Sequence, residues 1–427
     1  MLTIKFIREN QDLLVERLQV RNLKAEEIKD ILTNLIALDD ERRDNQTQND
    51  KILSENNKTA KLIGQLYKEG KRDEAESLKK QVAERKEKTT ILQERQHTVQ
   101  VEMEKLLFNL PNIPHPSVPA GNTDDDNELY KPCATPLPVL TDNAAPHWDL
   151  VQTYNLIDFE LGAKITGAGF PLFRGKGARL ERALINMFLD EAADAGFEEI
   201  VPPLLVNEAS ARGTGQLPDK EGQMYYMEKD DLYLIPTAEV PITNIYRDVI
   251  LDEKDFPIKL TGYTPCFRRE AGAHGKEVRG LNRVHQFDKV EIVQIEHPDK
   301  SYDTLMEMLG HVEGLLQKLE LPYRILRLCG GDLGFTAALT FDFEVYSAAQ
   351  KRWLEVSSVS NFETFQANRL KLRYRDENKK MQLAHTLNGS ALALARIVAA
   401  LLENNQTEEG IKIPKALQKY TGFAMIS

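Results

Sequence analysis

The chain has 427 residues, of which 41% are hydrophobic and 28% charged, and its formal net charge is −11. This composition is typical of a soluble globular protein, and with only 3 cysteines it excludes collagen-like, disordered and disulfide-framed chains. Residues 1–110 contain 21 Lys and Arg against 21 Asp and Glu, so the remainder carries the whole net charge. A uniformly basic DNA-coating protein is therefore excluded, whereas a local basic stripe is not.

Residues 1–110 have the composition of a long helical element. The first proline is Pro111, and the only glycines before it are Gly64 and Gly70. Apolar residues recur at helical spacing over residues 28–66 and again over residues 78–106. We therefore predict an antiparallel coiled-coil hairpin, with arms of about 35 to 40 residues and a break within Gly64–Asp73.

Basic residues gather towards the predicted tip of this hairpin. They are Lys51, Lys58, Lys61, Lys68, Lys71, Arg72 and Lys79. Charge runs of this kind usually form the solvated outer face of a coiled coil, and a finger that contacts phosphates is the alternative. The residues alone leave both interpretations open.

A linker rich in proline and aspartate follows at residues 111–134, and residues 135–427 are predicted to form one mixed domain. The predicted fold class is α+β. Strand-like runs alternate with helices at Ile200–Val206, Tyr233–Pro236, Gly262–Glu270, Val284–Ile295, Phe341–Ser347 and Trp353–Val359.

The sequence carries no signal for a membrane span or for secretion. The longest apolar run near the C-terminus, Ala391–Leu402, is too short to cross a bilayer and contains Arg396. The cysteines Cys133, Cys266 and Cys329 are scattered, with no metal-binding spacing, and no role follows for them. A reducing cytoplasm is the expected location.

Two strand-like runs on either side of the loop Ala271–Gly280 carry side chains suited to a nucleotide. In a hairpin, alternation would place Arg268 and Glu270 on one face, and would place Phe287 and Glu291 together on one face of the second strand. An arginine for phosphate, an aromatic ring for a base and carboxylates for amino groups are the parts of a nucleotide pocket. The alternative is an edge hairpin with cross-strand ion pairs.

Three further segments offer polar chemistry. Thr237-Ala238-Glu239 closes a strand-like run and presents a hydroxyl and a carboxylate on one face. Glu355 and Ser358 are hard oxygen ligands suited to Mg²⁺. Asn388–Arg396 is typical of a turn that leads into a helix, whose N-terminus could hold an anion; the alternative is a core helix with a snorkelling arginine.

Together these segments resemble the three motifs of class II aminoacyl-tRNA synthetases, in the right order. The segment Ala195–Leu204, with Pro203, resembles motif 1. Phe267–Glu270 together with Arg283–Phe287 resembles motif 2, and Gly389–Arg396 resembles motif 3. The resemblance narrows to the bacterial type of the seryl-tRNA synthetase family through Thr237–Glu239, Gly213–Pro218, Asn388–Ser390 and the N-terminal arm. It spans nearly the whole chain.

The resemblance implies a ligase that activates L-serine with ATP and passes it to tRNA(Ser), and also to tRNA(Sec) where that tRNA exists. It implies a cytoplasmic homodimer with motif 1 at the interface, ATP and Mg²⁺ as cofactors, no zinc, and neither DNA nor a membrane as partner. The catalytic domain, residues 135–427, would have an antiparallel β-sheet flanked by helices. The arm, residues 1–110, would contact tRNA through its basic tip.

The resemblance also implies roles for individual residues. ATP would be bound by Arg268, Arg269, Glu270, Phe287, Glu355, Val356, Ser357, Ser358 and Arg396, with Arg268, Glu355 and Arg396 catalytic. Serine would be bound by Thr237, Ala238, Glu239, Arg268, Glu291, Asn388 and Ser390. Mg²⁺ would be held by Glu355 and Ser358.

Two other functions remain open at this point. A synthetase-like ligase could pass the activated amino acid to a carrier protein, although the arm argues against it. The chain could also be a non-catalytic paralogue. The presence of the expected catalytic and ATP-binding residues argues against this: Arg268, Glu270, Glu355 and Arg396. In the predicted motif 2 loop, His274 could contact the tRNA acceptor end or face solvent; His285 is expected to be a hydrogen-bonded strand residue.

Overall fold

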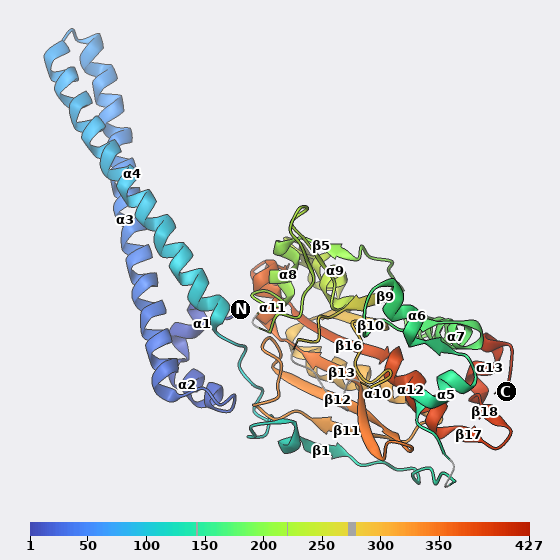
Figure 1. Ribbon diagram of the computed structural model, residues 1–427. Coiled ribbons are helices and arrows are strands. Elements are labelled where there is room, and N and C mark those ends of the chain that lie inside the picture. Colours follow the sequence, from blue (N-terminus) through green and yellow to red (C-terminus); the bar gives the residue numbers. More distant parts are fainter. Residues whose placement is uncertain (142–143, 220, 272–278) are drawn as a thin grey trace. The chain divides into compact units, whose positions relative to one another are not determined.

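The computed structural model describes residues 1–141, 144–219, 221–271 and 279–427 (Figure 1). Most of the predicted motif 2 loop, with His274, lies outside these residues. The chain forms two compact units. One contains Leu2–Gln19 and Leu23–Pro111, and the other contains Met1, Val20–Asn22 and Asn112–Ser427.

The first unit is a helical hairpin, as predicted. After the short helices α1 (Ile4–Glu9) and α2 (Gln11–Gln19), helix α3 (Ala25–Lys68) and helix α4 (Arg72–Asn109) lie side by side (Figure 1). With 44 and 38 residues, they are about 66 and 57 Å long. Their seam buries apolar side chains such as Leu32, Leu35, Val99 and Met103.

The hairpin turn lies within the predicted range Gly64–Asp73. It occupies the three residues between α3 and α4, where Gly70 has a φ of 78° that favours glycine. Gly64 lies inside α3, and beyond its own helix backbone and chain neighbours no atom lies within 4 Å of where its Cβ would be. A single glycine costs about 1 kcal/mol in a helix, which the long seam easily tolerates.

The second unit is built on an eight-stranded sheet. In spatial order its strands are β1 (Glu128–Lys131), β11 (Tyr323–Arg327), β12 (Leu339–Ser347), β13 (Arg352–Asn361), β16 (His385–Ala393), β10 (Gln286–Glu296), β9 (Ile258–Phe267) and β4 (Glu198–Glu199). All neighbours are antiparallel except β4 and β9. The predicted antiparallel catalytic sheet is therefore confirmed. Because β4 and β16 flank β9 and β10, the alternative of an edge hairpin is wrong.

Helices and small sheets surround this sheet. The helices are α5 (His147–Thr153), α6 (Phe159–Ile165), α7 (Gly175–Asp194), α8 (Glu208–Thr214), α9 (Glu239–Asn244), α10 (Ser301–Lys318), α11 (Thr364–Leu370), α12 (Leu394–Asn404) and α13 (Lys415–Thr421). The small strands are β2 (Ile157–Asp158), β3 (Leu172–Phe173), β5 (Leu205–Val206), β6 (Tyr226–Met227), β7 (Leu232–Leu234), β8 (Ile250–Asp252), β14 (Arg373–Arg375), β15 (Met381–Leu383), β17 (Gln406–Thr407), β18 (Gly410–Lys412) and β19 (Met425–Ile426).

The two faces of the sheet have different partners. Side chains of α7, α10 and α12, among them Phe188 and Ile397, form one large core with Val290 and Phe343. On the opposite face, Val293 packs with Ala238 and Ile242 from the start of α9. Since strand residues alternate between faces, Lys289 and Glu291 lie on the same side as Val293, away from the large core.

Strand β16 corrects one prediction. Asn388–Ala393 form a strand rather than a turn, and Arg396 lies in the first turn of α12 instead of two turns inside a helix. Asparagine and glycine usually indicate turns, but a Cβ on Gly389 would lie 3.2 Å from Val359 and 3.4 Å from Ile292. The glycine therefore permits close packing within the sheet.

Other predicted strands have different bounds from those expected. The run Ile200–Val206 contains only β5, because Pro202 and Pro203 have no N–H for a ladder. Strand β9 ends at Phe267, so Arg268–Glu270 leave the sheet, and Glu270 has a φ of 46°. The expected alternation of Arg268 and Glu270 on a strand face is wrong.

Among the described residues, no helix is both long and apolar enough to span a membrane.

Candidate active site

A buried polar cluster lies where α9 meets strands β10 and β16. We call it the acidic pocket and define it by Thr237, Glu239, Lys289, Glu291 and Ser390. Each is less than a tenth exposed. Glu291 pairs directly with Ser390 across the two strands, and Asn388, two residues earlier, shares the Ser390 face. The structure thus brings the predicted serine-binding residues of three elements to one place.

The hydroxyl of Thr237 connects the charged members of the acidic pocket. It donates to Glu291 Oε2 at 3.1 Å and accepts from Lys289 Nζ at 2.8 Å and from the Glu239 amide at 3.2 Å. Lys289 also forms an ion pair with Glu291. Burial raises the pKa of Glu291, and the Lys289 ammonium limits that rise.

Glu239 opens helix α9 instead of closing a strand as predicted. Its Oε1 accepts from Gln366 Nε2 at 2.6 Å, and Gln366 Oε1 accepts from Thr386 Oγ1 at 2.7 Å. Burial, and then the nearby charge of Glu291, raise the pKa of Glu239 to about 7. The pocket therefore holds two carboxyl groups and a single ammonium group, with one carboxyl able to titrate near neutrality.

Arg268 lies beside this pocket, directly after β9. Its backbone amide donates to His285 O at 2.9 Å, and its guanidinium carbon lies 5.3 Å from the centroid of the Phe287 ring. Its Nε is 3.4 Å from the carbonyl oxygen of Pro236, which precedes Thr237. Arg268 thus lies between the acidic pocket and the aromatic ring. His285 is hydrogen-bonded as predicted, with Nδ1 3.0 Å from Arg268 O, but it lies directly before β10 and not in the strand.

The residues after Arg268 are held by neighbouring loops. The Arg269 amide donates to Gln223 O at 2.8 Å, and Arg283 Nη1 donates to Glu270 Oε2 at 2.9 Å. The Glu270 carboxylate is therefore already paired with a guanidinium group, and its side chain is 16% exposed.

Arg396 approaches the same region from the other side of β10. It follows β16, whose Ala393 pairs with Lys289 of β10, and Phe287 lies two residues before Lys289 on the same face. Arg396 Nε donates to Asn282 O at 3.0 Å, and Nη1 donates to Glu355 O at 2.7 Å. These two carbonyls fix the plane of the guanidinium group.

Glu355 and Ser358 share one face because strand β13 contains a bulge. Opposite residues of β12 and β13 pair as Glu344 with Glu355 and as Asp342 with Ser358, so one extra residue, Val356, is accommodated between them. The Glu355 side chain is 52% exposed. The Ser358 hydroxyl donates to Asp342, whose pKa is raised well above its usual value by burial and then by Glu355.

The two residues between Glu355 and Ser358 point elsewhere. The Val356 side chain is in the large core, and the Ser357 hydroxyl donates to Ser390 O at 2.6 Å. Any contact of these two with a ligand would therefore come from their backbone. Among the described residues, no group of three or more His, Cys, Asp or Glu has a geometry suited to a metal ion.

Sequence reasoning gave no role to Lys289, Gln366 or Asp342. Alternation along one strand does place Lys289 on the same face as Phe287 and Glu291, but that position alone assigns it no role. Gln366 and Asp342 reach the site from α11 and β12, and nothing local in the sequence marks them. Only the tertiary packing reveals these two.

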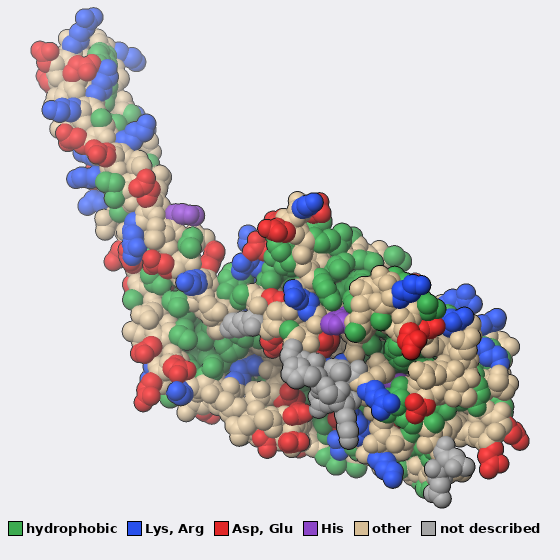
Figure 2. Space-filling model, viewed as in Figure 1, with side chains coloured by type: hydrophobic (Ala, Val, Ile, Leu, Met, Phe, Trp, Pro, Cys, Tyr) green, Lys and Arg blue, Asp and Glu red, His purple; other side chains and the backbone are tan. Residues whose placement is uncertain are grey.

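The basic residues of the arm tip are all exposed (Figure 2). Two form local ion pairs, Lys71 with Glu69 at 3.0 Å and Lys79 with Glu76 at 2.9 Å. The other five make no ion pair within the part of the chain that the structure describes. Figure 2 shows acidic side chains interspersed with the basic ones near the turn. The tip is thus a mixed surface that carries several unpaired cations.

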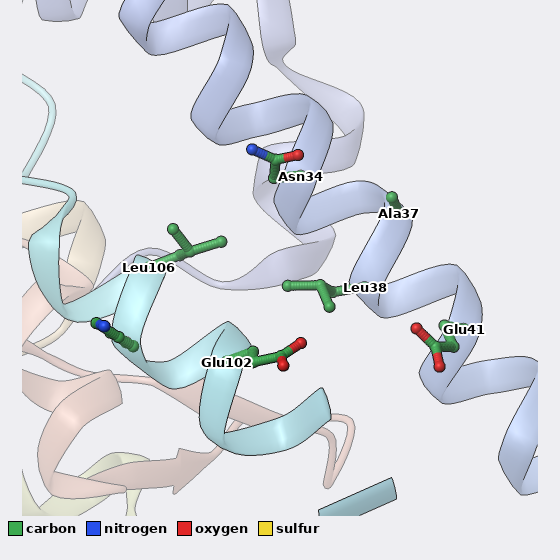
Figure 3. A pocket seen from close by; sticks show the side chains of 7 residues that line it. Asn34, Ala37, Leu38, Glu41, Glu102 and Leu106 are labelled. Carbon is green, nitrogen blue, oxygen red and sulfur yellow. The ribbon is translucent and has the colours of Figure 1, made fainter. Parts of the chain in front are cut away.

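The arm also has a hollow of about 480 Å³ between α3 and α4 (Figure 3). It is lined by Asn34, Ala37, Leu38, Glu41, Glu102, Lys105 and Leu106. None of the predicted site residues lies in it, so it is separate from the acidic pocket.

Comparison with known protein families matches both units of the chain to tRNA synthetase families. The family described as "Seryl-tRNA synthetase N-terminal domain" matches residues 1–114, and "tRNA synthetase class II core domain (G, H, P, S and T)" matches residues 224–405. A serine–tRNA ligase of Salinibacter ruber is 50% identical over 100% of this chain and 99% of its own. One from Chloroherpeton thalassium is 45% identical over the full length of both chains.

Solved structures give the same result. A seryl-tRNA synthetase from Pyrococcus horikoshii complexed with ATP superposes with a TM-score of 0.91 and 36% identity, covering 100% of this chain and 99% of that one. A cytoplasmic serine–tRNA ligase from Naegleria fowleri in complex with AMP has a TM-score of 0.86 and 27% identity, with the same coverage.

Proposed function

This chain belongs to the seryl-tRNA synthetase family, and we propose that the acidic pocket, with Arg268 and Arg396 beside it, is the site where it activates serine. The chain is a serine–tRNA ligase, since its serine–tRNA ligase relatives match it over its full length. The observation that carries the site assignment is the buried cluster of Thr237, Lys289 and Glu291 next to Arg268.

The first step joins serine to ATP. The serine carboxylate attacks the α-phosphorus, the bond to the β-phosphate oxygen breaks, and pyrophosphate leaves, so that seryl-adenylate forms. No protein nucleophile is needed, because the substrate supplies its own. The protein contributes positioning and neutralisation of the charge that develops on the phosphate. Arg268 would bind the α-phosphate and the serine carboxylate, and Arg396 would bind the γ-phosphate.

Serine recognition follows from the charges in the acidic pocket. Lys289 neutralises one of the two buried carboxylates, Glu239 and Glu291, and a serine ammonium group would neutralise the other. The serine hydroxyl would form hydrogen bonds with Thr237 and Glu291, which are already hydrogen-bonded to each other through the Thr237 hydroxyl. An alanine substrate has no hydroxyl to join this network, and a site built to hydrogen-bond a substrate hydroxyl discriminates strongly against an analogue that lacks it. Asn388 and Ser390 would line the floor on β16.

The nucleotide would lie on the Phe287 ring. Arg268 is already 5.3 Å from one face of that ring, and Arg396 comes from the end of β16 nearest to it. Glu270 would accept a hydrogen bond from the adenine amino group with the oxygen that Arg283 does not hold. Arg269 would add a further phosphate contact, and Val356 and Ser357 would contribute backbone atoms.

We assign Mg²⁺ to Glu355 and Ser358. The half-exposed Glu355 carboxylate and the Ser358 hydroxyl share one face through the bulge, and both offer the oxygen ligands that Mg²⁺ prefers. Bound there, Mg²⁺ would neutralise phosphate charge and orient the pyrophosphate leaving group. Asp342 would hold the Ser358 hydroxyl in place.

In the second step, a ribose hydroxyl of the tRNA attacks the serine carbonyl and AMP leaves. The exposed cations of the arm tip support a role for residues 1–110 in holding the tRNA backbone, and tRNA(Ser) and tRNA(Sec) are the proposed substrates. Residues 111–134 would be the linker, whose strand β1 joins the edge of the sheet, and residues 135–427 would supply the rest of the catalytic domain.

A homodimer is supported by apolar side chains of motif 1. Val201 is 89% exposed, and Leu204 is 37% exposed. A cytoplasmic location is supported by three cysteines that are all free. Sedimentation of the purified chain tests the dimer, because a fully active monomer would contradict it.

The test of the proposed function is serine-dependent exchange between ATP and radioactive pyrophosphate, followed by charging of total tRNA. We expect exchange with serine and not with alanine or threonine, and transfer of the serine to tRNA rather than to a carrier protein. Exchange that is equal for serine and alanine would contradict the assignment of the acidic pocket.

A further inference from the structure

A buried hydrogen-bonded network lies beneath Arg396, and the proposed reaction makes no use of it. His147, at the start of α5, and Glu403, near the end of α12, are both fully buried. His147 Nδ1 is 2.7 Å from Glu403 Oε1, and the His147 backbone amide also donates to that oxygen at 2.9 Å. The other oxygen, Oε2, accepts from the Ser347 hydroxyl. Both oxygens of the Glu403 carboxylate therefore accept hydrogen bonds from buried donors.

The far side of the His147 ring holds the end of the motif 2 loop. The Leu281 amide donates to His147 Nε2 at 2.9 Å, so that nitrogen is the acceptor and the ring proton is on Nδ1, facing Glu403. Gly280 lies against the ring so closely that a Cβ there would be 2.3 Å from Nε2. The Arg279 guanidinium carbon lies 4.5 Å from the centroid of the Trp148 ring.

The side chain of Gln350 connects Asn282, the residue after Leu281, to the Glu403 carboxylate through hydrogen bonds. Asn282 Nδ2 donates to Gln350 Oε1 at 2.9 Å, and Gln350 Nε2 donates to Glu403 Oε1 at 3.0 Å. The Asn282 carbonyl in turn accepts from Arg396 Nε at 3.0 Å. Arg396 and Glu403 are seven residues apart on α12 and so lie on one helix face. Arg396 contacts Asn282 directly, and Glu403 is connected to Leu281 through His147 and to Asn282 through Gln350.

This arrangement decides how the Arg396 guanidinium group points. Its Nε is held by Asn282 O and its Nη1 by Glu355 O, and its Nη2 has no partner among the described residues. If the Asn282 carbonyl shifted, Nε would lose its acceptor and the group could rotate. A guanidinium group recognises phosphate through its planar fork, so its orientation matters as much as its charge.

We propose that His147 and Glu403 are positioning residues for ATP: they fix the segment Leu281–Asn282, whose carbonyl orients Arg396 towards the phosphates. The proposal rests on the proposed function, because Arg396 must bind ATP for its orientation to matter. His147 and Glu403 touch no substrate, and they act only through this segment.

The experiment measures ATP and serine dissociation constants by calorimetry on the full-length chain, with pyrophosphate exchange as a second readout. The test variant is His147→Asn, whose amide can still donate to Glu403 but is too short to reach the Leu281 amide. The matched control is Ser347→Ala, which removes a buried donor from the same carboxylate without touching Leu281. Thermal unfolding of each variant checks the fold.

For His147→Asn we expect the ATP dissociation constant and KM for ATP to rise about tenfold, with serine affinity and kcat within about threefold of wild type. Ser347→Ala should leave the ATP constant within about twofold. A His147→Asn variant that folds and binds ATP as Ser347→Ala does would overturn the proposal.

The double variant His147→Asn, Arg396→Ala separates this proposal from the proposed function. If the pair acts through Arg396, the histidine change should alter ATP affinity less than about twofold once Arg396 is gone. The same tenfold loss in both backgrounds would overturn the positioning role and leave the function intact. If Arg396→Ala by itself binds ATP normally, the ATP assignment of Arg396 fails and the proposal fails with it.

Gly280→Ala keeps the test decisive if His147→Asn does not fold. Its Cβ would push the segment away from His147 Nε2 while leaving the His147 and Glu403 pair in place. We expect the same selective loss of ATP affinity. Unchanged ATP binding in a folded Gly280→Ala variant would also overturn the proposal.

Discussion

Lys289 and Glu291, two residues apart on one face of β10, form an ion pair whose side chains are 7% and 1% exposed. The pair is held by the Thr237 hydroxyl, which contacts both members. Removing one member of a buried pair leaves the other charge without compensation, so the acidic pocket is sensitive to single changes.

Replacing Glu291 by alanine should abolish serine activation while sparing ATP. We expect kcat/KM for serine to fall about 1,000-fold or more and the ATP dissociation constant to stay within about threefold. Pyrophosphate exchange and calorimetry measure the two quantities. The double variant Lys289→Met, Glu291→Met is the control for folding, because it removes both charges together. Equal losses for serine and ATP in Glu291→Ala would refute the assignment.

Replacing Arg268 by alanine should cause pyrophosphate exchange to collapse. Arg268 lies between the acidic pocket and the Phe287 ring, where it would neutralise charge that develops on the α-phosphate. Arg268→Lys keeps the charge without the planar fork and should lie between the alanine variant and wild type. Exchange by Arg268→Ala within about tenfold of wild type, roughly 1.4 kcal/mol, would rule out this role.

Serine affinity should rise with pH through the neutral range. Burial raises the pKa of Glu239 to about 7, so this carboxyl is mostly protonated below that pH and ionised above it. The serine ammonium group needs the second negative charge, so serine affinity should improve about tenfold between pH 6 and pH 8. Calorimetry over this range measures it. In Glu239→Gln the dependence should flatten; an unchanged slope in that variant would show that another group titrates.

Shortening the arm should separate the two steps of the reaction. Arg95 Nη2 donates to Glu41 Oε2 at 2.7 Å, so these residues face each other across the hairpin and a short glycine linker can join them. Deleting residues 42–94 should leave pyrophosphate exchange within about twofold and reduce tRNA charging about 100-fold or more. Parallel loss of both activities would show that the arm is not a separate module.

Much of the fold could be predicted because its signals are local. The arm is marked by a lack of proline and a helical apolar period, and strands β10, β12 and β13 lie close to their predicted positions. The segment Asn388–Ser390 was wrongly predicted because asparagine and glycine favour turns in isolation. In the fold, close contact with Val359 and Ile292 decides the conformation of Gly389.

The site was predictable only where its residues lie in motifs. Thr237, Glu239, Glu291 and Ser390 do gather in one pocket. Gln366, however, reaches Glu239 from α11, a separate element whose sequence gives no sign of the contact. Partners of this kind depend on packing between distant segments, which a single sequence does not reveal.

The bulge at Val356 makes the local backbone of strand β13 as important as its side chains. Residues that are two apart on a strand share a face without any irregularity, whereas Glu355 and Ser358 are three apart and share a face only because Val356 is an extra residue. A substitution that straightened the strand at Val356 without changing the number of residues would therefore put the carboxylate and the hydroxyl on opposite faces, although neither had been altered. An engineer who grafts this strand into another protein has to transfer the bulge together with the two side chains.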